Sequence, residues 1–262
     1  MVFFNLYVKL SVNASLLRSS VATQPSSASI VSLAERANAL PGNRLTALAQ
    51  KAYHEIKQMV LTNKVHGGEY LLEEDLARAV GMSRTPLREA LVQLQTERLI
   101  AIVPRRGIRI VPLTVDDMRE VYELLEWLES QAAYALAQRP DREPYVKELR
   151  ALAGKMKTAL AAGDMEAWAK ANDLFHIRLV ASAGNRRLIL ICENLLDQSQ
   201  RVRAFTLRAR KPPTRTTDAH ARMLNAIEAG DADKAAAIQR ENKRAWLKEL
   251  EELIRQLQLR YL

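Results

Sequence analysis

The chain has 262 residues, enough for two ordinary domains. Aromatic residues make up only 5% of it and glycines number nine, which argues against an all-β fold and favours helices. Its single cysteine, Cys192, excludes a disulfide framework and a cysteine-based zinc site, and it fits the reducing cytoplasm, where we expect the protein to act.

Residues 1–43 are the least informative part of the sequence: Met1 to Leu17 is apolar but mixed, and Ser, Ala, Thr and Pro dominate from Ser19 to Ser32. No basic residues precede the first apolar run, as they would in a signal peptide. No stretch approaches the roughly 18 uninterrupted apolar residues of a membrane helix, so we expect no membrane association. We expect this segment to be a disordered extension, or translation from a start codon assigned too early.

Three helices are predicted within residues 44–112. The first spans 46–61, and the other two are joined by a tight turn at Gly81, since a glycine commonly follows the last residue of a helix. Ser83 is the expected N-cap of the third helix, with Pro86 in its first turn. The second helix is predicted to bury one face made of Leu72, Leu76 and Ala79.

The start of the third helix has the chemistry of a recognition helix in a helix-turn-helix. Arg84, Thr85 and Arg88 are left at its outward N-terminal end, where such a helix meets bases and phosphates in the major groove. Arginine there can bond guanine bidentately or clamp a phosphate. On this pattern alone, a helical hairpin with an exposed basic face is an equally good interpretation.

Two short β-branched runs, 100–103 and 108–111, follow the helices and predict a hairpin. Between them lies a turn with Arg105 and Arg106 at its tip and Gly107 after them. A helix-turn-helix followed by a basic-tipped hairpin is a winged helix. This predicted domain holds 11 lysines and arginines against 7 acidic residues, which suits a surface that binds phosphates.

The run from Ser83 to Leu91, followed by Arg98-Leu99-Ile100 and Arg105-Arg106-Gly107, strongly resembles the DNA-binding domain of GntR-family bacterial transcription regulators. The resemblance implies a homodimer, more often a repressor, that binds a pseudo-palindromic operator in double-stranded DNA. One departure is the acidic Glu73-Glu74-Asp75, where a basic or polar residue is common, and it weakens an expected phosphate contact. The expected DNA contacts are Ser83, Arg84, Thr85, Arg88, Arg105, Arg106 and Gly107.

Residues 113–262 are predicted to be helical throughout, starting with Thr114 and Asp116-Asp117 as a cap and an acidic first turn. Six helices joined by short turns make a bundle. The chain is therefore predicted to be mainly α, with an N-terminal winged helix-turn-helix and an all-α bundle of about six helices. The expected bundle helices are 115–138, 142–162, 164–183, 186–209, 215–229 and 231–258.

The bundle resembles the FCD-type ligand-binding domain of the FadR subgroup of the GntR family. The matching residues are Phe175-His176, Ala183-Gly184-Asn185, His220 with Ala226-Ile227, and Gly230-Asp231-Ala232. Together with the winged helix, the resemblance covers residues 44–258. It implies a divalent metal held by an acidic or amide residue, a histidine one turn later and two further histidines. It also implies a small carboxylate effector that the metal helps to hold.

Asn172 and His176 have the required spacing, because residues four apart share one helix face. His220 stands at the next position of the metal set, but Asn242 replaces the last histidine, and Leu125 stands where the family often has an arginine facing the effector. Amide oxygens are weak donors for first-row transition metals. Three interpretations stay open: a weakly loaded zinc, nickel or manganese site, a pocket that binds its ligand without metal, or two core histidines hydrogen-bonded to the asparagines.

No acidic residue occurs from Gln198 to Thr217, and the basic run in this stretch is most often a solvated face: Arg201, Arg203, Arg208, Arg210 and Lys211. Arg201 or Arg203 could instead turn inward and pair with an anionic effector. The three tryptophans, Trp127, Trp168 and Trp246, are expected to pack in the core or in an interface. The expected effector contacts are Asn172, His176, Arg201, Arg203, His220 and Asn242.

The leading hypothesis is a ligand-responsive transcription regulator, and we do not expect an enzyme. A ligand-independent DNA-binding dimer, whose bundle serves only for dimerisation, is the first alternative. A helical metalloenzyme using His176 and His220 is the second, but no H-E-x-x-H helix, serine elbow, phosphate loop or dinucleotide fingerprint is present. Turnover of a carboxylate would support the enzyme, whereas operator binding that ignores every small molecule would support the ligand-independent dimer.

Overall fold

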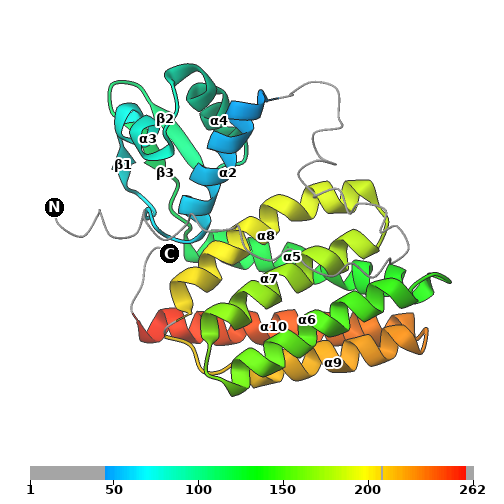
Figure 1. The fold of residues 1–262 in the computed structure, drawn as a ribbon. Helices are drawn as coiled ribbons and strands as arrows, with labels where there is room; N and C mark the ends of the chain where they lie inside the picture. Colours follow the sequence, from blue (N-terminus) through cyan, green and yellow to red (C-terminus); the bar gives the residue numbers. More distant parts are fainter. Residues whose placement is uncertain (1–44, 208, 258–262) are drawn as a thin grey trace, which may run out of the picture.

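The computed structural model describes residues 45–207 and 209–257, so the interpretations offered for residues 1–43 and for Arg208 lie outside it. A small domain of helices and a short sheet lies beside a larger bundle of helices (Figure 1). The predicted fold class, a winged helix-turn-helix followed by an all-α bundle, is confirmed.

The winged domain, residues 45–112, contains three helices and a three-stranded antiparallel sheet. Its strands lie in the order β1-β3-β2, and the pairing of β2 with β3 is the predicted hairpin. The third strand was not predicted: it has two residues, too few to show any alternation. The elements are α2 (Ala47–Leu61), β1 (Tyr70–Leu71), α3 (Glu73–Val80), α4 (Arg84–Thr96), β2 (Ile100–Val103) and β3 (Gly107–Ile110).

The turn between α3 and α4 forms as its residues predict. Gly81 ends α3 in the left-handed conformation, with φ 63°, which glycine adopts without a steric penalty. Ser83 is the N-cap of α4, although its hydroxyl makes no capping hydrogen bond. The buried face of α3 differs from the prediction: Leu76 and Val80 are buried, four residues apart, while Leu72 is 59% exposed.

The bundle consists of six helices among the described residues, and each begins and ends within three residues of its predicted bounds. Thr114 and Asp117 form the capping box expected at its start. None of the helices that the structure describes is long and apolar enough to cross a membrane. The helices are α5 (Val115–Gln138), α6 (Glu143–Ala161), α7 (Met165–Ser182), α8 (Arg186–Thr206), α9 (Thr214–Glu228) and α10 (Ala232–Gln256).

Each domain has its own apolar core. In the bundle, Trp168 and Trp246 are buried as expected, whereas Trp127 on α5 is 61% exposed. In the winged domain the core forms between α2, α3, α4 and the sheet. The two domains meet where α2 lies beside α8, the bundle helix nearest to the winged domain (Figure 1). The position of α8 therefore sets the position of the winged domain.

Candidate functional site

The start of α4 presents the predicted DNA contacts to solvent: Ser83, Arg84, Thr85 and Arg88 are all exposed. The two arginines are already paired with the first turn of α3. Arg84 Nη2 donates to Glu74 Oε1 at 2.8 Å, and Arg88 Nε donates to Glu73 Oε1 at 2.6 Å. The acidic residues noted in the sequence thus neutralise the recognition arginines, and DNA phosphates or bases must compete with them.

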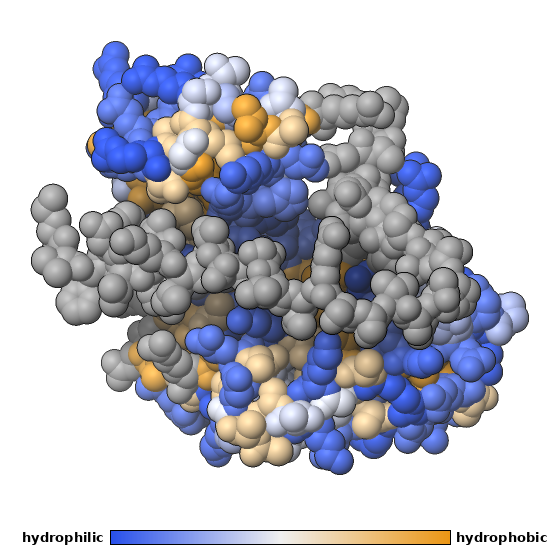
Figure 2. All heavy atoms as spheres, in the orientation of Figure 1, coloured by the Kyte–Doolittle hydropathy of each residue, from blue (hydrophilic) through white to orange (hydrophobic). Residues whose placement is uncertain are grey.

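The wing carries its two arginines at an exposed tip, and the left side of the winged domain in Figure 2 is largely hydrophilic. Arg105 has a positive φ of 63°, and the Arg106 N–H donates to Val103 O at 3.0 Å, which closes the turn. Gly107 follows with φ 90°, and a Cβ built there would lie 2.4 Å from Leu71 O of β1. Only glycine therefore fits between the wing and the strand beside it.

A second candidate site lies inside the bundle, between α7, α8, α9 and α10. It is a cavity of about 20 Å³, the space of about one water molecule. We call it the effector cavity. Its lining brings together three of the four predicted metal positions and Arg203, together with residues that were not predicted. The lining residues are Trp168, Asn172, His176, Arg203, Arg210, Thr216, Asn242, Lys243 and Trp246.

His220, the fourth predicted position, is fully buried next to this cavity. Its ring stacks on Phe175 with centroids 4.2 Å apart, and it meets the edge of His176 at 5.2 Å. Neither of its ring nitrogens has a hydrogen-bond partner among the described residues. Burial lowers the pKa of His220 well below its ordinary value, so this imidazole is neutral at pH 7.

Behind the lining of the effector cavity lies a carboxylate that sequence reasoning missed, Glu129 of α5, which is completely buried. Its Oε2 lies 2.8 Å from His176 Nδ1 and accepts a hydrogen bond from Gln239 at 2.5 Å, while Lys243 Nζ lies 2.8 Å from its Oε1. Burial by itself would raise the pKa of Glu129, but the groups of His176 and Lys243 hold that pKa below its ordinary value. The carboxylate is therefore charged.

These contacts replace the hydrogen bonds that the third interpretation expected between the two histidines and the two asparagines. His176 turns its Nδ1 to Glu129 instead. Asn242 Oδ1 accepts a hydrogen bond from Arg215 Nη1 at 3.2 Å, and Asn172 Oδ1 is buried without a hydrogen-bond partner. That interpretation is wrong for this site, because neither histidine makes a hydrogen bond to either asparagine among the described residues, and His176 lies against the charged Glu129 instead.

The predicted metal positions do not fit a divalent ion well. Asn172 Oδ1 and the His220 nitrogens have no partner, but they are neutral donors. Nowhere in the described part of the chain do three His, Cys, Asp or Glu side chains come together in a way that could hold a metal. Lys243 and Arg210 place positive charge on the same cavity, which repels a dication.

Arg210 was expected on a solvated face but turns into the bundle. Its guanidinium lies over the ring of Trp246, 4.0 Å from the centroid, and over Trp168 at 5.0 Å. Its Nε is buried without a hydrogen-bond partner, and burial lowers the pKa of Arg210 to about 10. Arg210 thus brings a positive charge to the cavity that no carboxylate of the described residues neutralises.

The two other arginines of the basic run separate. Arg203 lines the effector cavity, and its Nε donates to Asp173 Oδ1 at 2.6 Å. Arg201 lies at the domain boundary instead, where its Nη2 donates to Val111 O at 2.9 Å. Successive helix residues turn by about 100°, so positions 201 and 203 face nearly opposite sides. The structure therefore places Arg201 away from the predicted effector contacts.

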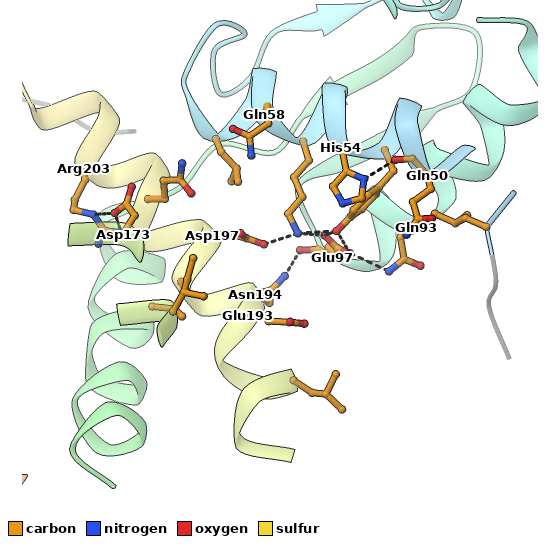
Figure 3. A pocket seen from close by; sticks show the side chains of 18 residues that line it. Gln50, His54, Gln58, Gln93, Glu97, Asp173, Glu193, Asn194, Asp197 and Arg203 are labelled. Atoms are coloured by element: carbon orange, nitrogen blue, oxygen red, sulfur yellow. Dashed lines mark hydrogen bonds and ion pairs between the residues drawn. The ribbon is translucent and has the colours of Figure 1, made fainter. Parts of the chain in front are cut away.

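A larger cavity, about 500 Å³, lies between the winged domain and the bundle; we call it the interdomain cavity (Figure 3). Lys57 of α2 crosses it, with Nζ 2.6 Å from Asp197 Oδ2 of α8 and 3.0 Å from Glu97 Oε2. Asn194 of α8 donates to Glu97 O at 2.7 Å. Arg203 lines this cavity as well as the effector cavity. The helix α8 therefore connects the two sites.

Comparison with known proteins matches both parts of the chain to family models. Residues 48–110 match the model of bacterial regulatory proteins of the gntR family, and residues 120–245 match the FCD domain. A helix-turn-helix-type regulator of Agrobacterium vitis, described as uncharacterized, is 37% identical over 160 residues, which cover 60% of this chain and 94% of that protein. The gluconate operon transcriptional repressor of Bacillus subtilis is 27% identical over 68% of this chain and 74% of its own length.

Solved structures show the same fold. The Escherichia coli protein McbR/YncC superposes with a TM-score of 0.69 at 21% identity, over 79% of this chain and 98% of its own. The crystal structure described as that of a putative transcriptional regulator from Rhodococcus sp. RHA1 superposes with a TM-score of 0.68 at 17% identity. The match covers 79% of this chain and 99% of that chain. The arrangement of a winged domain beside a helical bundle is thus shared with these proteins.

Proposed function

Because the chain belongs to the GntR family of bacterial regulatory proteins and carries an FCD domain, we propose that this DNA-binding transcription regulator is a repressor controlled by a small organic anion. It would act as a homodimer on a pseudo-palindromic operator in the cytoplasm. One observation carries the proposal: the single helix α8 supplies Arg203 to the effector cavity, and Asn194 and Asp197 to the contact with the winged domain.

On the DNA side, the start of α4 enters the major groove and the wing follows the neighbouring backbone or minor groove. Arg84 and Arg88 exchange their glutamate partners for base edges or phosphates. Arg105 and Arg106, exposed at the wing tip, contact the adjacent strand. The exposed Ser83 hydroxyl, which makes no capping hydrogen bond, is available to a phosphate.

On the effector side, the chemistry supports a carboxylate. Arg210, Arg203 and Lys243 line one cavity, and an arginine fork matches the two oxygens of a carboxylate. The name of the Bacillus subtilis relative, a gluconate operon repressor, suits a ligand of this charge. A carboxylate that binds one position of α8 better than another shifts the winged domains and so the affinity for the operator.

A second copy of this chain is the simplest partner for the exposed apolar side of α5. Leu124 and Trp127 lie one turn apart there, 51% and 61% exposed. A symmetric dimer would bury both side chains and set the distance between two winged domains. Changing Trp127 to Glu should convert the dimer to a monomer in analytical ultracentrifugation, while the same change at the exposed Leu174 of α7 should leave the dimer intact.

The proposal is tested by selecting an operator from genomic DNA and titrating it with the full-length protein by fluorescence anisotropy. Arg88→Ala should weaken specific binding by roughly 1–3 kcal/mol if this arginine contacts a base. Arg255→Ala, an exposed arginine near the end of α10, is the control and should have no effect. Added carboxylates should change operator affinity. Binding that ignores every carboxylate tested would support the ligand-independent dimer instead.

A further inference from the structure

We propose that the effector cavity binds a small carboxylate directly, without a metal ion, and that the Arg210 guanidinium supplies the positive charge that a metal would otherwise provide. The inference rests on the proposed function, which places an anionic effector in this cavity. The inference adds that the positive charge facing the carboxylate comes from a side chain of the protein and not from a metal ion.

The charges around the cavity favour an anion over a dication. Arg203, Arg210 and Lys243 contribute to its lining, whereas no aspartate or glutamate of the described residues does. Asp173 and Glu129 lie behind this lining and neutralise Arg203 and Lys243, one each. The charge of Arg210 is left over, because its guanidinium lies over the faces of two tryptophans and forms no ion pair with the described residues. The cavity is therefore positive by one charge.

The nearest carboxylate is not available to a metal. Both oxygens of Glu129 are used, Oε2 by His176 and Gln239 and Oε1 by Lys243. A metal that took Glu129 as a ligand would leave the ammonium of Lys243, which is 5% exposed, without a partner. An unpaired buried charge is strongly destabilising. A metal bound here would need Glu129 as a free ligand, and the ion pair with Lys243 keeps this carboxylate from serving as one.

A carboxylate would satisfy groups that now lack partners. The Nε of Arg210 is buried without an acceptor, and charge-assisted hydrogen bonds to carboxylates are among the strongest in proteins. The cavity of about 20 Å³ is smaller than a carboxylate of several carbons, so Arg210 must leave Trp168 and Trp246 as the ligand enters. The indole rings would then cover the apolar part of the ligand, and their fluorescence would report the exchange.

The test uses full-length protein purified without a histidine tag and stripped with EDTA, its metal content checked by mass spectrometry. Succinate and citrate are titrated into it by calorimetry and tryptophan fluorescence, before and after addition of zinc, nickel or manganese. We expect one of these carboxylates to bind the stripped protein, with no gain from metal. Arg210→Gln should weaken that binding about tenfold or more, the loss of one hydrogen bond to a charged group.

Lys243 needs a paired variant, because Lys243→Met alone leaves Glu129 buried and uncompensated. The double variant Glu129→Gln/Lys243→Met removes both charges together, so it should fold and keep carboxylate binding, because the cavity stays positive by one charge. Lys248→Met, at an exposed lysine of the same helix, is the matched control and should bind as the unmodified protein does. Asn242→His, which restores a third imidazole, serves as the reference for metal binding.

The outcomes separate the two proposals. A carboxylate that binds only after metal loading overturns the metal-free site and leaves the proposed effector class intact. An Arg210→Gln variant that still binds with full affinity, or a double variant that loses binding, overturns the role of Arg210 as the source of the positive charge. If no carboxylate binds with or without metal, the anionic effector itself is wrong, and this inference is overturned with it.

Discussion

Arg203 of α8 and Asp173 of α7 form a buried ion pair that lies between the two cavities. Arg203 lines both the effector cavity and the interdomain cavity, and Asp173 lines the interdomain cavity (Figure 3). A carboxylate that draws Arg203 toward itself would weaken its hold on Asp173. Burial raises the pKa of the neighbouring Asp197, and the charge of Asp173 adds to that rise. Through this pair, a ligand that binds in the effector cavity can change the contacts in the interdomain cavity.

Asp173→Asn should therefore bind carboxylates more tightly, because Arg203 is released from its partner. The same change should lower the free energy of unfolding by on the order of 3 kcal/mol, since a nearly buried guanidinium loses its counter-charge. Urea denaturation and calorimetric titration measure the two effects, with Asp116→Asn, at an exposed aspartate, as the control. Weaker carboxylate binding would mean that Asp173 positions Arg203 for the ligand.

Glu193 gives a prediction about pH. Its Oε1 is buried without a hydrogen-bond partner, and burial raises its pKa to about 7. Between pH 4.5 and 7 the folded protein keeps a proton that the unfolded chain has lost, so this group costs stability as the pH rises through that window. Glu193→Gln cannot ionise, and its stability relative to the unmodified protein should increase from pH 5 to pH 8.

The stability of Glu193→Gln must be compared with that of the unmodified protein at each pH, because other groups titrate in the same window. His176 and His220 have lowered pKa values, so they contribute the opposite trend below pH 6.5 in both proteins. Urea denaturation at several pH values gives the difference directly. A difference that is constant across the window would show that Glu193 is already ionised in the folded state at pH 5.

The acidic first turn of α3, the helix that precedes α4, should reduce the affinity for DNA. Glu73→Gln/Glu74→Gln frees Arg88 and Arg84 from their exposed ion pairs, which water and salt keep weak. Operator affinity should rise roughly 2- to 10-fold, with a steeper dependence on salt because more phosphate contacts form. Anisotropy titrations over a range of salt concentrations test this. A loss of affinity would instead mean that the glutamates orient the arginines for base contacts.

Gly107→Ala should distort the wing. Its φ of 90° and the 2.4 Å approach of a Cβ to Leu71 O both oppose a side chain. Gly68→Ala is the matched control, because Gly68 has a similar φ of 85° but nothing within 4 Å of a Cβ. We expect Gly107→Ala to lose more stability than the control, whose cost should be about 1 kcal/mol. Equal melting temperatures for the two variants would contradict this.

The elements were predictable because local features define them. Thr114 caps α5, Gly81 ends α3, and the β-branched runs beside Gly107 form the hairpin, each from residues close in sequence. The strand β1 was missed because two residues show no period, and its register depends on the partner strand.

The effector cavity was only partly predictable. His176 and Asn172 share a helix face, which their spacing shows, and they do meet Arg203 and Asn242. Glu129 and Lys243 were missed because a charged residue in a helix is usually solvated. Only packing against other helices reveals that these two, 114 positions apart in the chain, pair with each other.

The separate apolar cores of the two domains have a consequence for heat denaturation. The winged domain and the bundle meet through polar side chains such as Lys57, Asn63 and Asn194, while their apolar clusters share no residue. Melting should then occur as two calorimetric peaks, and a single transition temperature would not describe the protein. An effector bound in the bundle would move the peak of the bundle directly. Any movement of the peak of the winged domain would measure how much free energy crosses the domain boundary.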